Sequence, residues 1–154
     1  MRILYIISLV LLHSFFLAQT NDSVSLNSSC SHQSFYNFND GEIANVDNTN
    51  WDLAFSSGGY GSAIRINSQA GVELYVYPNG DINDWNSVDI TNISNWPSII
   101  NSDTTWSIGA FNATSDPTNS LDLGWGVYST ITHHITGDSL HIVKLSNGDY
   151  KKLQ

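Results

Sequence analysis

The sequence predicts an all-β domain made of antiparallel sheets with hairpins and little helix. Apolar and polar residues alternate over several short runs, as in strands that bury one face. The clearest runs lie at 51–55, 64–67 and 72–77. Glycine, asparagine and proline residues separate these runs, as turns require. Helix-favouring residues are scarce, with only two glutamates in 154 residues, and β-branched and aromatic residues carry the apolar content.

Composition divides the chain into three segments. Residues 1–18 are typical of a secretory signal peptide, because a basic residue precedes an apolar stretch that ends at an alanine. An uncleaved anchor helix is disfavoured because the apolar stretch is short. Residues 19–34 are small and polar without periodicity, so we expect a disordered lead-in. Residues 35–154 are long enough to form one folded domain.

Within this domain, the expected strands follow one another along the chain. Their ranges are 35–38, 42–46, 51–55, 64–67, 72–77, 124–128, 128–136, 139–146 and 149–153. The turn Asn39-Asp40-Gly41 separates the first two strands. Gly137-Asp138 and Asn147-Gly148 predict two-residue hairpin turns between the last three. Because the last strand ends at Gln154 without a turn, its sheet either finds partners elsewhere in this chain or continues in a longer protein.

The stretch 81–123 is less regular than the rest of the domain. Four apolar residues could line one side of a short helical turn: Ile93, Trp96, Ile99 and Ile100. Pro97 limits the length of such a turn. Residues 102–109 fit either a helix start or a strand, and residues 112–123 have the composition of a loop.

Charge excludes several classes of partner. Removal of the signal peptide leaves four basic residues against 14 acidic ones, a net charge of −10. Nucleic acid and anionic membrane surfaces are therefore disfavoured partners. No transmembrane segment is expected in the mature chain. The single cysteine, Cys30, cannot form an internal disulfide, and its polar neighbours argue against a lipid-attachment site.

Catalytic motifs are missing from the sequence. It contains no Gly-x-Ser-x-Gly elbow, no phosphate-binding loop and no His-Glu-x-x-His pair. Aspartates are common in the expected loops, but their spacing matches no calcium-loop signature and singles out no catalytic pair. We therefore expect a protein that is not an enzyme.

The central motif consists of WDLAF at 51–55 and IRINS at 64–68. It resembles the core of HmuY-like proteins, which are secreted or surface haem-binding β proteins of the Bacteroidetes. The ending, Asn-Gly-Asp followed by YKKL at 150–153, resembles the closing hairpin of that family. The resemblance covers about residues 35–154 and is closest to the branch that precedes type IX secretion sorting domains. It implies a right-hand-like β sandwich in which axial side chains hold haem.

Histidines are the candidate ligands for haem or a metal ion. A two-residue turn at Gly137-Asp138 would place His134 opposite His141, with Cβ atoms about 5 Å apart. This spacing suits a transition-metal ion, and one of these residues or the adjacent His133 could supply one haem ligand. The alternative is that His134 and His141 are half-exposed cross-strand neighbours. The sole methionine is Met1, which excludes a bis-Met haem site after signal cleavage.

Arg65 is the only arginine outside the signal peptide. A lone guanidinium could clamp a ligand carboxylate such as a haem propionate. The alternative is an ion pair with Asp52 or Glu73. We also expect Asp52, which lies between the apolar residues Trp51 and Leu53, to accept a hydrogen bond from the backbone at the sheet edge.

Aromatic residues offer a second kind of binding surface. Several tryptophans and tyrosines lie among Asn, Asp and Gly residues, a composition that suits sugar binding. Tyr75 and Tyr77 are the best candidates because strand alternation places them on the other face of the strand from Val72, Leu74 and Val76. Trp125, between two glycines, is also a candidate. The alternative for each is core packing, which accounts for most tryptophans.

These observations favour a secreted or cell-surface binding module without catalytic activity. Haem, another small ligand or a glycan is the expected partner, and haem is the one cofactor that the resemblance implies. The alternatives are a carbohydrate- or surface-binding adhesion domain, and a structural passenger of a protein secreted by the type IX system.

Overall fold

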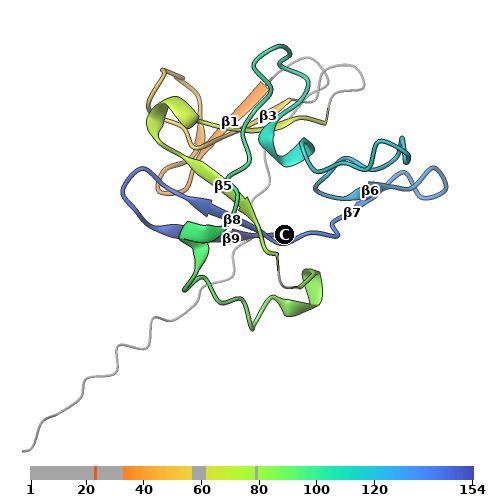
Figure 1. The fold of residues 1–154 in the computed structure, drawn as a ribbon. Coiled ribbons are helices and arrows are strands. Elements are labelled where there is room, and N and C mark those ends of the chain that lie inside the picture. The colour runs from red at the N-terminus through yellow and green to blue at the C-terminus, as the bar shows by residue number, and fades with distance from the viewer. Residues whose placement is uncertain (1–22, 24–32, 57–61, 79) are drawn as a thin grey trace, which may run out of the picture.

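A computed structural model describes residue 23 and residues 33–56, 62–78 and 80–154. The described residues form nine strands and four 3₁₀ helices, and every paired strand is antiparallel (Figure 1). The predicted all-β class is confirmed. The expected signal peptide, Cys30 and most of the expected lead-in lie outside the described residues. No helix in the described ranges is long and apolar enough to cross a membrane.

The first sheet has four strands in the order β2-β1-β3-β4. They are β1 (Gln33–Asn37), β2 (Gly41–Ile43), β3 (Leu53–Ser56) and β4 (Ile64–Ile66). Each follows a predicted strand, although β2 ends earlier than expected. The predicted lead-in extends too far, because Gln33 and Ser34 already pair with Ser56 and Phe55. Ser34 is buried within this sheet.

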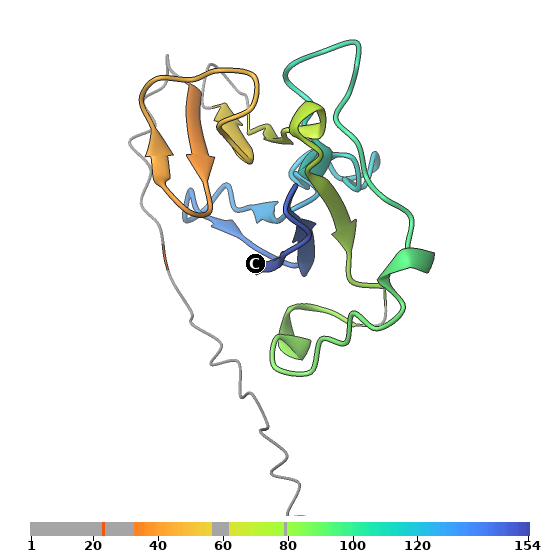
Figure 2. The same ribbon diagram turned by 90° about the vertical axis from the view of Figure 1, so that its left-hand side faces the viewer.

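The second sheet has the order β5-β8-β9, and a two-stranded sheet pairs β6 with β7 (Figures 1 and 2). The strands are β5 (Glu73–Val76), β8 (His141–Lys144), β9 (Tyr150–Leu153), β6 (Val127–Tyr128) and β7 (Ile135–Thr136). β5 and β8 lie far apart in the sequence, so the pairing that holds β5 in this sheet is a long-range contact.

The predicted pairing of 128–136 with 139–146 is wrong. A turn at residues 129–134 interrupts the expected strand, and the His133 amide donates to the carbonyl of Ser129 at 2.9 Å. His133 has a φ of 60°, a left-handed conformation that ends strand geometry. β7 therefore folds back on β6, and β8 pairs with β5 and β9. Gly137-Asp138 connects two different sheets.

The predicted hairpin at Asn147-Gly148 is present, but its loop has three residues where two were expected. The Leu145 amide donates to the Asp149 carbonyl at 2.8 Å, and the Gly148 amide donates to the Leu145 carbonyl at 2.9 Å. Gly148 has a φ of 90°, which a side chain would disfavour. This is the geometry of a turn that ends in a left-handed glycine.

The main core joins the two larger sheets. Leu53 and Ile66 from the first sheet contact the same cluster as Leu74 and Val143 from the second. The 3₁₀ helix η4 (Ala110–Asn112) adds the buried Phe111. Alternation along β3, β4 and β5 thus places one face of each strand in a shared core, as the sequence predicts.

The second sheet is covered on its other face as well. Tyr75 and Ile142 pack there against Ile93, and Trp96 lies alongside. Ile93 belongs to η3 (Ile93–Asn95), which confirms the predicted helical turn. The other two residues expected on the same side differ: Ile99 pairs with Leu74 and packs against the main core, and Ile100 is 70% exposed. Residues 102–109 form neither an α-helix nor a strand; they are turns and bends that lead into η4.

Two asparagine side chains cover the free edge of β4. Asn101 accepts from the Ile66 amide at 3.1 Å and donates to the Ile66 carbonyl at 2.7 Å. Asn112 accepts from the Ile64 amide at 3.1 Å. Gly109 lies so close that an added Cβ would come within 2.0 Å of the Ile64 carbonyl oxygen. These contacts hold the 101–112 segment along β4. They cover a strand edge that could otherwise pair with another strand.

Candidate ligand-binding site

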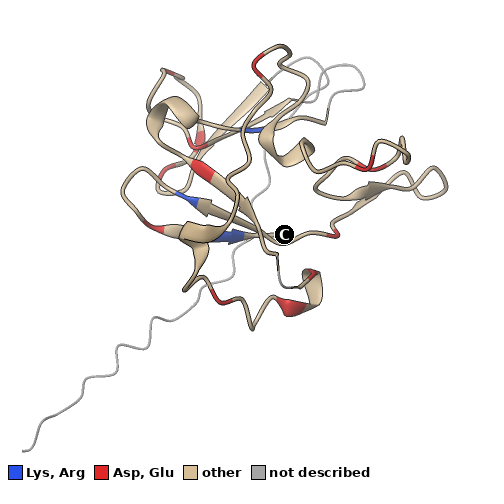
Figure 3. Cartoon of the chain, viewed as in Figure 1, with Lys and Arg blue, Asp and Glu red and all other residues tan. Residues whose placement is uncertain are grey.

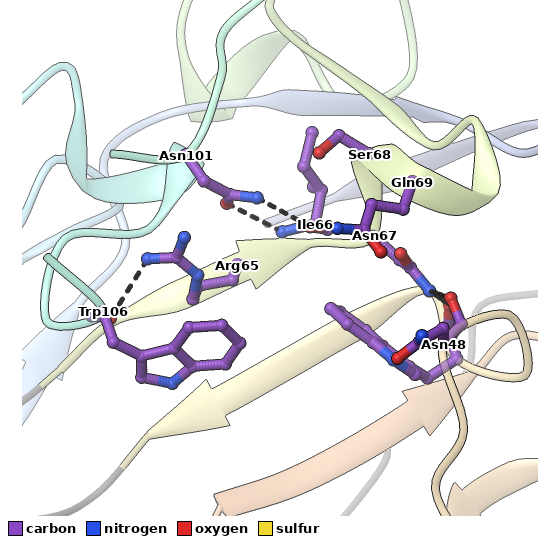
Figure 4. A pocket seen from close by; sticks show the side chains of 9 residues that line it. Asn48, Arg65, Ile66, Asn67, Ser68, Gln69, Asn101 and Trp106 are labelled. Atoms are coloured by element: carbon purple, nitrogen blue, oxygen red, sulfur yellow. Dashed lines mark hydrogen bonds between the residues drawn. The ribbon is translucent and has the colours of Figure 1, made fainter. Parts of the chain in front are cut away.

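A hollow of about 240 Å³ lies between β4, the start of η1 (Ser68–Ala70), the 48–51 turn and the 101–106 segment (Figure 4). Its lining consists of Asn48, Trp51, Arg65, Ile66, Asn67, Ser68, Gln69, Asn101 and Trp106. The lining is mostly amide, hydroxyl and indole groups. It contains one cation and no carboxylate, although the chain as a whole is strongly acidic.

Arg65 organises the wall of this hollow. Its side chain is only 8% exposed, and Nη1 donates to the carbonyls of Thr105, Trp106 and Ile108 at 3.0, 3.2 and 3.0 Å. Nη2 donates to the Ser102 carbonyl at 2.9 Å. Burial lowers the pKa of the guanidinium, but an arginine remains charged at any ordinary pH. One side chain from β4 thus fixes the course of the 102–108 loop.

Arg65 also positions the indole of Trp106. The guanidinium carbon lies 4.2 Å from the ring centroid, in cation–π geometry (Figure 4). Trp106 nevertheless stays 45% exposed. A large apolar ring that is held at its backbone and at one face, and is still open to solvent, is suited to receive a ligand.

Asn67 fixes the opposite side of the hollow. This residue is 3% exposed, and its Nδ2 donates to the carbonyls of Asn48 and Trp51, each at 3.0 Å. Its Oδ1 accepts from the Ala70 amide at 3.2 Å. Trp51 packs edge-on against Phe35, with ring centroids 5.2 Å apart. Asn67 therefore holds the 48–51 turn against η1.

Three polar side chains on the rim remain available. The side chains of Asn48, Ser68 and Gln69 make no hydrogen bond to any other described residue, and all three residues are exposed. The amides of Asn67 and Asn101, by contrast, are engaged with the backbone. The hollow thus combines a rigid floor with free hydrogen-bonding groups at its mouth.

The structure does not bring the predicted histidine ligands together. His141 pairs with Val76 and Leu153, so the expected opposition to His134 is wrong. His141 is 2% exposed, and its ring lies 4.7 Å from that of Phe111. His134 is exposed in the β6–β7 turn.

The remaining histidine, His133, lies on the surface. Its Nδ1 is 2.7 Å from the Tyr128 hydroxyl, with which it shares a hydrogen bond. Among the described residues, no three His, Cys, Asp or Glu side chains gather in a way that could hold a metal ion. The three candidate histidines therefore lie in separate surroundings.

Tyr75 is a buried residue, so its prediction as a surface aromatic is wrong. Alternation does place Tyr75 on the face of β5 that points away from Leu74. The 81–100 segment covers that face, however, and leaves Tyr75 only 7% exposed. Its hydroxyl donates to Glu73, and burial together with this carboxylate raises the pKa of Tyr75 to about 12. Tyr77 is half-buried, with its ring 5.7 Å from that of Trp96.

Trp125 is also half-buried, with its ring packed against the main core. Its Nε1 donates to the Ser62 carbonyl at 3.1 Å. The flanking glycines, Gly124 and Gly126, are themselves buried, because the backbone approaches them closely. Trp125 is therefore anchored in the fold and does not form an open platform.

The predicted ion pair of Arg65 with Asp52 or Glu73 is wrong. Glu73 accepts from Lys144 Nζ at 2.7 Å and also from the Tyr75 hydroxyl, and these two hydrogen bonds lower the pKa of Glu73. Asp52 is 6% exposed and accepts from the Phe38 amide at 2.8 Å, which confirms its predicted backbone contact. Figure 3 shows that the basic segments, in blue, are few and lie among more numerous acidic segments, in red.

Sequence reasoning selected Arg65 but missed most of the hollow. The alternation over 51–55 predicts that Trp51 lies on the buried face of its strand, and nothing in the sequence distinguishes Trp106 from the other aromatic residues. Asn67 and Asn101 carried no signal, because only the fold brings residues 48, 67 and 101 together. The one available clue was an indole next to turn-forming residues, Thr104-Thr105-Trp106-Ser107.

Comparisons with protein-family models, with curated proteins and with solved structures gave no match for this chain. The resemblance to HmuY-like proteins therefore stays a prediction, and the functional argument rests on the geometry of the hollow.

Proposed function

We propose that this chain is a secreted or cell-surface binding module without catalytic activity, and that its hollow binds one sugar unit of a glycan. The observation that carries the proposal is Trp106, an exposed indole held in place by the buried Arg65 beside free amide and hydroxyl groups. The proposal agrees with the carbohydrate-binding alternative that the sequence suggests. It places the sugar at aromatic residues other than the expected Tyr75, Tyr77 and Trp125, however.

The chemistry of a sugar matches this lining. One face of a pyranose ring presents C–H groups that pack on an aromatic face, and its edge presents hydroxyls that need both donors and acceptors. Asn48 and Gln69 supply both through their amides, and Ser68 does so through its hydroxyl. The volume of about 240 Å³ is below the range of roughly 300–1,000 Å³ common for drug-sized ligands, which favours a single sugar unit.

Replacing Trp106 by alanine should weaken glycan binding by about tenfold, since one well-packed aromatic contact contributes on the order of 1–1.5 kcal/mol. The fold should survive, because the ring is 45% exposed. A glycan array followed by titration of the best ligand measures the effect.

Trp85→Ala is the matched control for this experiment. Trp85 also stacks on a cation, with Lys152 Nζ 4.3 Å from its ring centroid, but it does not line the hollow. We expect Trp85→Ala to bind like the wild type. Equal losses in both variants, or normal binding by Trp106→Ala, would remove the hollow from consideration.

Haem binding is a separate proposal that the resemblance to HmuY-like proteins motivates. Of the three candidate histidines, His133 and His134 are exposed and could reach a ligand, whereas His141 is buried. No feature of the hollow favours a porphyrin over a sugar. Titration of the wild-type chain with haemin addresses this proposal directly.

A further inference from the structure

We infer that the sugar unit bound in the hollow is acidic, and that Arg65 binds its carboxylate. This inference rests on the proposed glycan-binding function and specifies the class of glycan. It would give Arg65 a role in recognition in addition to its role in holding the 102–108 loop.

The hydrogen-bond count of Arg65 leaves donors for a ligand. A guanidinium has five N–H groups. The two on Nη1 serve three carbonyls, and Nη2 serves the Ser102 carbonyl. One N–H of Nη2 and the N–H of Nε have no acceptor among the described residues. Two neighbouring N–H groups are what a carboxylate engages in a bidentate contact.

The free Nε of Arg65 is not completely buried, although the residue as a whole is only 8% exposed. Among the described residues, the one fully buried side-chain nitrogen or oxygen without a hydrogen-bond partner is His141 Nε2. Nε of Arg65 has no such partner, so it is not sealed inside the protein. Because Arg65 lines the hollow, a bound ligand can reach the guanidinium from that side.

Charge in and around the hollow favours an anion. Within the described part of the chain, Arg65 has no carboxylate partner, whereas Lys144 is paired with Glu73. The lining holds no acidic side chain, although Asp47 and Asp103 belong to segments next to it. A largely buried cation without an anion is costly, and a ligand carboxylate would offset that cost. A neutral sugar would leave the guanidinium of Arg65 without a counter-ion.

The experiment compares acidic polysaccharides with their own methyl esters. Polygalacturonate and alginate are titrated against the wild-type chain beside fully methyl-esterified samples of each, which keep the sugar rings but lose the charge. We expect at least one free acid to bind tenfold or more tightly than its ester, and Trp106→Ala to weaken that binding by about tenfold. Because this comparison uses the wild-type chain, it does not depend on a variant that folds.

Arg65→Lys provides the second measurement. Lysine keeps the positive charge but has no pair of adjacent donors, so the preference for acid over ester should shrink if the variant retains its fold, as judged by circular dichroism. Lys151→Ala, which removes a charge from β9 outside the hollow, should keep the full preference.

The outcomes separate this inference from the proposed function. Equal binding of acids and esters, or binding of neutral glycans alone, would overturn the inference and leave the glycan-binding function standing. Failure to bind any acidic or neutral glycan would overturn both.

Discussion

Replacing Arg65 by methionine should lower the free energy of unfolding by about 2–4 kcal/mol. The variant removes the guanidinium donor from four backbone carbonyls of the 102–108 loop, of which that of Ile108 keeps the Ser102 amide as a second donor. Buried polar groups that lose a partner cost roughly 1–3 kcal/mol each, but this loop is partly exposed and water can replace some of the lost bonds. Trp106 also loses the cation on which it stacks. Urea denaturation followed by circular dichroism measures the loss.

Lys144→Met is the control for the effect of removing a cation. Lys144 forms an ion pair with Glu73 in which both side chains are about one-third exposed. Solvent screens such a pair, so the loss of Lys144 should lower the free energy of unfolding far less than the loss of Arg65. A similar small loss for Arg65→Met would show that the guanidinium does not organise the loop.

The wild-type chain should lose about 3 kcal/mol of stability through His141 as the pH falls from 6.5 to 4. Burial lowers the pKa of His141 from its ordinary value of 6.5 to about 4, and the charge of Asp138 offsets only a small part of this. Below pH 6.5 the unfolded chain binds a proton that the folded chain does not, so folding becomes less favourable. The loss is complete near the folded pKa, and each pKa unit corresponds to about 1.4 kcal/mol.

His141→Leu isolates this contribution. Since His141 Nε2 has no partner within the described part of the protein, an apolar side chain of similar size should cost little at pH 7. The difference in unfolding free energy between variant and wild type should grow in favour of the variant from pH 6.5 to 4 and level off below pH 4. A constant difference across this range would mean that His141 is protonated in the folded state.

The strands were predictable because alternation is a local signal. Leu53, Ile66 and Leu74 occupy the core as their two-residue period requires. The register of the C-terminal strands was not predictable in the same way. Gly137-Asp138 has the composition of a hairpin turn, but the chain had already reversed at His133. Two turn-forming stretches lie within ten residues here. The sequence alone does not tell which of them joins two strands that pair with each other.

The candidate site was only partly predictable, and the reason is sequence separation. Arg65 stood out as a lone arginine, but its acceptors are backbone carbonyls 37 to 43 residues away, which no side-chain pattern marks. Tyr75 shows the opposite failure. Its alternation was read correctly, but a second layer covers the face on which it lies. Strand periodicity identifies two faces of a strand and does not tell whether one is exposed.

The most direct test of a sugar-binding hollow is the indole N–H region of an ¹H–¹⁵N spectrum. The chain has five tryptophans, which give one indole signal each. On titration with the tightest-binding glycan, the signals of Trp51 and Trp106 should shift, since both indoles line the hollow. Those of Trp85, Trp96 and Trp125 should stay in place. Shifts confined to these three, or binding without any shift at Trp51 and Trp106, would contradict the proposed site.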